Sequence, residues 1–81
     1  MSMAEFELSR LPVGEFARVV DIKVEGLIHN RLLDLGLVPS TVVEAVRKSP
    51  AGDPVAYKIR GALIALRLEE SRNITVRPDN C

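Results

Sequence analysis

One stretch of the chain, residues 24–37, carries the hydrophobic spacing of a helix. Ile28, Leu32 and Leu35 stand at positions i, i+4 and i+7, which places all three on one face of a helix of about three turns. The side chains between them are mostly polar. The pattern therefore predicts a short helix with one apolar face, which must be buried against the rest of the chain.

The residues that follow this apolar stripe predict where the helix ends. Gly36 stands directly after the last periodic residue, where a residue with positive φ commonly terminates a helix. Leu37 is then placed to fold back onto the last turn, and Pro39 prevents the helix from continuing. We therefore expect Gly36 to be the C-terminal cap.

Most of the remaining chain reads as short strands, rich in Val, Ile and Thr or alternating between apolar and polar residues. The five expected strands are residues 16–22, 41–47, 55–60, 63–67 and 74–76. In the first of them we expect Phe16, Val20 and Ile22 on one face and Arg18 among the outward residues. The turn cluster at 49–54 and Gly61 predict two successive hairpins.

The flanking segments are less regular. Residues 1–7 are expected to form a frayed tail or a short edge strand, and residues 78–81 a tail. A loop over residues 8–15 should tuck Leu8 and Leu11 under the domain. Residues 69–72 suit a single helical or 3₁₀ turn.

Five strands with one helix between the first two predict a mainly β fold, a small SH3-like barrel over residues 8–77. The length of 81 residues allows one domain only. Hydrophobic residues make up 47% of the chain but aromatic residues only 4%, so we expect a core of Val, Leu, Ile and Ala.

Charge and cysteine content limit the function classes. Eleven basic residues balance eleven acidic ones, so no long-range field would attract nucleic acid, and stacking aromatic residues are scarce. The single cysteine, Cys81, excludes an internal disulfide, and no apolar run approaches the roughly 20 residues that span a bilayer. We expect a cytosolic protein that binds no nucleic acid and is not itself inserted in the membrane.

Spaced motifs resemble those of the FeoA family, the small cytosolic proteins of bacterial ferrous iron transport. The matching positions are Arg31, Leu32, Asp34, Leu35, Gly36, Leu37, Pro39, Thr41, Ser49, Pro50, Gly52, Asp53, Pro54, Arg60, Gly61, Ile64, Ala65, Leu66, Arg67, Glu70, Ile74 and Val76. Two departures are Ser40, where the family usually has Gly, and Ser71, where it usually has Ala. A type I turn at Ser40, or about 1 kcal/mol of local strain, is expected.

The resemblance implies an SH3-like barrel that docks on FeoB, a membrane Fe(II) transporter with a cytosolic G-protein domain, and modulates it. The alternative is a metal-responsive regulatory module, similar to the C-terminal domain of iron-dependent repressors. We expect a monomer or a weak homo-oligomer, and no enzyme, because one His and one terminal Cys offer no assembled base and nucleophile.

Three side chains near the start of the predicted helix are weak candidates for metal ligands. His29 and Glu25 lie at i and i+4, and Asp21 could approach from the preceding strand. Two or three such side chains on a solvated surface do not make a closed site. No required cofactor is therefore expected, and at most weak or adventitious binding of a transition metal.

Two surfaces are candidates for binding the partner. Leu33 lies about 140° around the helix from Ile28, away from the buried stripe and near His29 and Leu37, so it either covers Leu37 or anchors a partner. The second candidate is basic and lies on the central hairpin: Arg47, Lys48, Lys58 and Arg60. Arg31 and Asp34, spaced i and i+3, are expected to pair on the helix.

Overall fold

The computed structural model of the protein describes residues 4–23, 27–34 and 36–79, and only the backbone of residues 27–29. Its elements are β1 (Phe6–Glu7), η1 (Leu8–Arg10), β2 (Phe16–Ile22), α1 (Leu27–Asp34), β3 (Val42–Lys48), β4 (Val55–Ile59), β5 (Ala62–Leu66), α2 (Leu68–Ser71) and β6 (Ile74–Pro78). None of the helices in these ranges has the length and apolar character needed to cross a bilayer.

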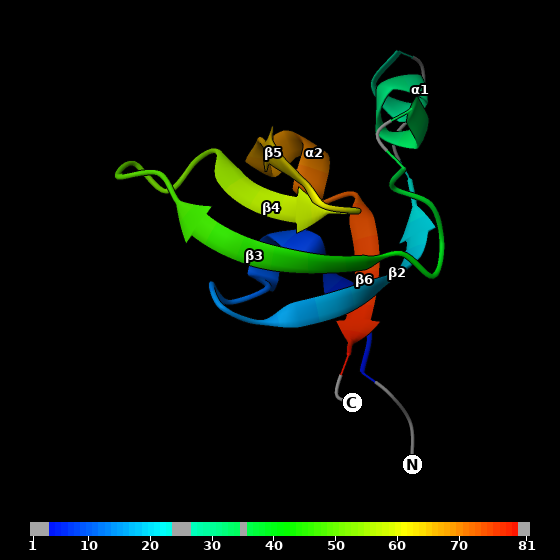
Figure 1. The fold of residues 1–81 in the computed structure, drawn as a ribbon, viewed down its shortest axis with the longest axis horizontal. Helices are drawn as coiled ribbons and strands as arrows, with labels where there is room; N and C mark the ends of the chain where they lie inside the picture. Colours follow the sequence, from blue (N-terminus) through cyan, green and yellow to red (C-terminus); the bar gives the residue numbers. More distant parts are fainter. Residues whose placement is uncertain (1–3, 24–26, 35, 80–81) are drawn as a thin grey trace.

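The six strands form one antiparallel sheet in the order β1-β6-β2-β3-β4-β5. The sheet bends strongly so that β6 passes behind β3 (Figure 1), but its two edge strands, β1 and β5, do not pair with each other. Helix α1 stands at one end of this open barrel, and both ends of the chain lie at the other end. The predicted SH3-like architecture is confirmed, with the short edge strand β1 as a sixth strand.

The prediction for the inward face of β2 is wrong at Phe16. The structure buries Ala17 and Val19, while Phe16 is 49% exposed. Val19 pairs with Val76 and Asp21 with Thr75, so Val20, also expected on the inward face, is instead the extra residue of a bulge. This extra residue restores an inward position to Ile22, which packs against the core.

Tyr57 lies at the centre of the core, together with the predicted Leu8 and Leu11. The expectation of an entirely aliphatic core is therefore wrong. The Tyr57 hydroxyl donates a hydrogen bond to the backbone carbonyl of Leu8 over 3.3 Å, which satisfies the buried polar group. Burial raises the pKa of the Tyr57 hydroxyl above its ordinary value, and the nearby Ser71 side chain lowers it in part.

The end of α1 has the predicted geometry. Gly36 has a φ of 90°, and its N–H donates to the carbonyl of Leu33 over 2.9 Å. The N–H of Leu37 donates to the carbonyl of Leu32 over 2.9 Å, which completes a Schellman motif. Leu32 and Leu37 are both fully buried, so the end of the helix is fixed to the core.

The turn after α1 is strained at Ser40, the residue that departs from the family pattern. The N–H of Thr41 donates to the carbonyl of Val38 over 3.0 Å, and Ser40 has a φ of 78°, as in a type II turn. The Arg18 guanidinium donates to the carbonyl of Ser40 over 2.9 Å and pairs with Asp79 over 3.2 Å. The sequence predicted either a type I turn or local strain at Ser40, and the structure has the strain.

Replacing this serine with glycine should therefore stabilise the domain. Ser40→Gly is expected to raise the free energy of unfolding by about 0.5–1 kcal/mol, because glycine adopts positive φ without the steric cost that serine carries. Urea denaturation of both proteins measures the difference. An equal or lower midpoint for the glycine variant would show that the turn carries no strain.

Candidate functional site

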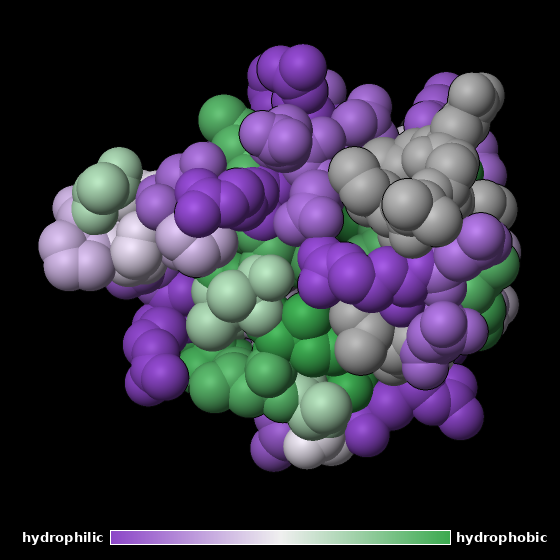
Figure 2. Space-filling view, turned by 90° about the horizontal axis from the view of Figure 1, so that it is seen from above, coloured by the Kyte–Doolittle hydropathy of each residue, from purple (hydrophilic) through white to green (hydrophobic). Residues whose placement is uncertain are grey.

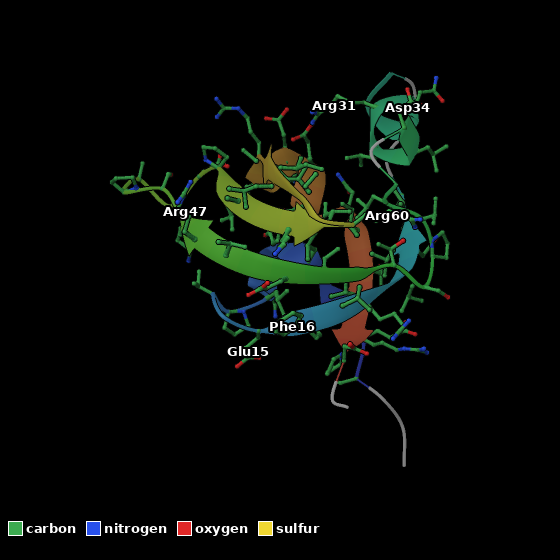
Figure 3. All side chains as sticks on the ribbon, in the orientation of Figure 1. Glu15, Phe16, Arg31, Asp34, Arg47 and Arg60 are labelled. Atoms are coloured by element: carbon green, nitrogen blue, oxygen red, sulfur yellow. The ribbon has the colours of Figure 1, made fainter. Side chains whose placement is uncertain are left out.

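Helix α1 presents two consecutive leucines to opposite environments. Leu32 is fully buried, whereas Leu33 is 40% exposed. Asn30, Arg31 and Asp34 are also exposed, so the other exposed side chains that the structure describes on α1 are polar. Figure 3 shows this helix at the end of the barrel, with Arg31 directed toward α2. The predicted separation of a buried and an exposed leucine is confirmed.

An ion pair ties α1 to α2. The Arg31 guanidinium lies 2.7 Å from the Glu70 carboxylate, whose other oxygen accepts the backbone N–H of Arg67 over 3.0 Å. Glu70 is thus held in place as part of the N-terminal cap of α2 before it meets Arg31. The predicted pair between Arg31 and Asp34 is wrong, because this positioned carboxylate takes the guanidinium instead.

Leu37 does not belong to the exposed face of α1. Its side chain is fully buried in the core. The sequence suggested that Leu37, together with Leu33, contacts a partner. A fully buried side chain cannot make that contact directly, so this prediction is wrong for Leu37. Leu37 supports the surface only by fixing the end of the helix.

The four basic residues of the central hairpin are exposed but lie at its two ends. Arg47 pairs in register with Ala56, and Lys58 with Glu44. Figure 3 shows Arg47 beside the β3–β4 loop and Arg60 at the opposite end, near α1. The structure therefore offers two smaller basic sites, Arg47 with Lys48 and Lys58 with Arg60, and not one continuous patch.

The weak metal candidates are only partly described. Asp21 is exposed, and its carboxylate accepts the backbone N–H of Ile22 over 2.9 Å. Glu25 and the side chain of His29 lie outside the described residues. Within the described ranges, no group of three or more His, Cys, Asp or Glu side chains is placed to hold a metal ion. The expectation of weak metal binding stays a prediction.

Two exposed apolar residues of the sheet were missed from the sequence. Phe16 lies between two shallow hollows of about 430 and 360 Å³. Leu63 on β5 is 52% exposed and helps to line a groove of about 420 Å³ beside the β3–β4 loop. The sequence did contain a signal for Leu63, because all five residues of β5 are apolar and cannot all face a core.

Comparison with known proteins places the chain in a family. A family model described as the FeoA domain matches residues 6–78. A fusion of Fe(2+) transport protein A with the Fe(2+) transporter FeoB, from Porphyromonas gingivalis, is 33% identical over 69 residues. That match covers 85% of this chain but only 8% of the much longer fusion protein.

Solved structures of similar proteins share the fold. The FeoA protein of Chlorobium tepidum superposes with a TM-score of 0.88 at 35% identity, over 93% of this chain and 71% of that one. Stenotrophomonas maltophilia FeoA, described as an SH3 domain protein and solved with zinc, gives 0.74 at 32% identity, over 88% of both chains. By sequence and by fold, the chain belongs to the FeoA family.

Proposed function

We propose that this chain is a non-enzymatic accessory protein of Fe(II) uptake that docks on the cytosolic part of a FeoB-type transporter and modulates it. The contact is made by the exposed face of α1 around Leu33. The observation that carries this proposal is a partly exposed leucine on a helix whose end and orientation are both fixed. A helix that is already fixed in place loses little backbone entropy on binding, which favours an apolar side chain on it as an anchor.

The fused relative supports the choice of partner. In the Porphyromonas gingivalis protein, an FeoA-like sequence and the transporter FeoB are parts of one polypeptide. A fusion holds two domains at a high effective concentration, which favours a weak contact between them. The chain would accordingly act at the inner face of the membrane, through its partner.

Fe(II) uptake in cells tests this function. In a strain that lacks this chain, complementation with Leu33→Glu is expected to give the uptake rate of the uncomplemented strain, because a buried charge at the anchor abolishes docking. Leu68→Glu is the matched control, since Leu68 on α2 is 51% exposed and receives the same change. It should restore the wild-type rate. Full uptake with Leu33→Glu, at equal protein level, would exclude the α1 face.

A metal-responsive role is the second candidate, favoured by the zinc complex of the Stenotrophomonas maltophilia relative. Anaerobic titration of chelator-treated protein with Fe(II) separates the two functions. We expect no saturable binding near micromolar Fe(II), because the candidate ligands Asp21, Glu25 and His29 are too few for a closed site. Stoichiometric binding that is lost in His29→Ala would favour metal sensing.

A further inference from the structure

Strand β5 is an unusually unprotected sheet edge. It pairs with β4 alone, and all five of its residues are apolar. Natural edge strands are commonly kept short or carry charges or proline, which prevents pairing with other chains. The opposite edge, β1, follows that rule with only two residues. β5 has none of these protections.

The backbone groups of two β5 residues point away from the sheet. Arg60 and Gly61, with φ values of 51° and 85°, form a two-residue turn of the I′ type between β4 and β5. In such a hairpin the pair next to the turn is hydrogen-bonded, and bonded and non-bonded pairs then alternate. Leu63, opposite Lys58, and Ala65 therefore direct their N–H and C=O groups outward. In the described part of the chain, no turn, cap or side-chain hydrogen bond uses these groups.

The same two residues line the groove beside this edge. Its lining is Arg47, Lys48, Ser49, Pro50, Pro54, Ala56, Leu63 and Ala65, around a volume of about 420 Å³. The lining contains two cations and no acid. Figure 2 shows hydrophobic atoms gathered next to the protruding β3–β4 loop, with hydrophilic atoms around them.

The loop that walls the groove is held in place. The Asp53 carboxylate accepts the backbone N–H of Leu68 over 2.8 Å, which joins the loop to the start of α2. Within the loop, the N–H of Gly52 donates to the carbonyl of Ser49 over 2.8 Å. The groove is therefore largely formed before any ligand arrives, which lowers the entropic cost of binding.

We propose that β5 binds an extended, acidic segment of a partner protein as an additional strand. The segment pairs with the outward groups of Leu63 and Ala65, places an apolar side chain in the groove, and directs carboxylates toward Arg47 and Lys48. Charge complementarity identifies this occupant, because a second copy of the chain would present the same two cations. No residue of α1 is among those that line the groove, so this site is separate from docking through Leu33. Figure 3 shows Arg47, one of the two cations, at the end of the hairpin away from α1.

Titration of the isotope-labelled whole chain with an unlabelled peptide tests the proposal. The probe is a blocked peptide of about ten residues with threonine at every second position and valine and glutamate in turn at the positions between, so that valine and glutamate lie on one face of the added strand. We expect the backbone amide signals of Leu63 and Ala65 to shift and their hydrogen exchange to slow, with those of Leu33 unchanged. A peptide with lysine in place of glutamate should bind at least about tenfold more weakly.

Substitutions in β5 test whether the peptide binds at this strand. Leu63→Glu should weaken binding at least about tenfold, and Leu33→Glu, the same change on the exposed face of α1, should not. Ala65→Pro removes an outward N–H without breaking the pairing with β4, and should also prevent binding. Absence of shifts at millimolar peptide, or equal affinity for the lysine peptide, would overturn the proposal. Shifts of β5 that depend on protein concentration alone would identify a second copy as the occupant and overturn it too.

Discussion

Leu32→Ala is expected to lower the free energy of unfolding by roughly 2–5 kcal/mol, the usual cost of removing a fully buried leucine side chain. The loss combines the transfer free energy of the removed methine and two methyl groups with the cost of the cavity left behind. A small domain has only about 5–15 kcal/mol of stability in total. Urea denaturation should therefore show a much lower midpoint, or a protein that is already partly unfolded in buffer.

Leu33→Ala is the matched control for this prediction. It makes the same substitution one residue further along α1, but at a side chain that is 40% exposed. Its cost should be less than about 1 kcal/mol. Equal midpoints for the two variants would mean that the two leucines do not lie in different environments, and would contradict the orientation of α1.

Gly36→Ala has the second largest expected effect, a loss of about 1–2 kcal/mol in the free energy of unfolding. An alanine at a φ of 90° is strained in any surroundings. In addition, a Cβ at this position would fall onto the Cδ atom of Arg60, whose side chain lies across the glycine. The change should therefore disturb both the end of α1 and the Arg60 side chain.

A second glycine separates the two causes. Gly14 has a φ of 94°, but a Cβ there would meet no atom within 4 Å. Gly14→Ala should carry the backbone strain alone, and Gly36→Ala should cost more. Adding Arg60→Ala to the Gly36→Ala variant should recover the difference. An extra cost that Arg60→Ala does not recover would mean that it does not come from the contact with Arg60. An unchanged midpoint for Gly36→Ala would contradict the capping role of the glycine.

Local chemistry explains which parts of the fold were predictable. The helix end at Gly36 depends on neighbouring residues only, so the sequence was sufficient to place it. The inward face of β2 was not predictable from alternation, because the bulge after Val19 changes the alternation within the strand. A similar bulge between Ala45 and Arg47 of β3 turns Arg47 to the outer face, where it helps to line the groove.

Contacts between residues far apart in the sequence explain what was missed at the candidate sites. Arg31 meets Glu70 and not Asp34, because the cap of α2 holds a carboxylate beside α1. No rule of helical spacing contains that information. The exposed edge of β5 depends on sheet order, since the same apolar strand at the centre of the sheet would be buried on both sides.

Binding of the purified chain to the cytosolic part of its FeoB-type transporter is the most direct test of docking through α1. Calorimetry or co-purification should show a complex with the wild-type chain and with Leu68→Glu. Leu33→Glu, folded by its melting curve, should bind at least about thirtyfold more weakly, the loss of an interface anchor worth about 2 kcal/mol. Equal affinity for Leu33→Glu and wild type would contradict docking through this face.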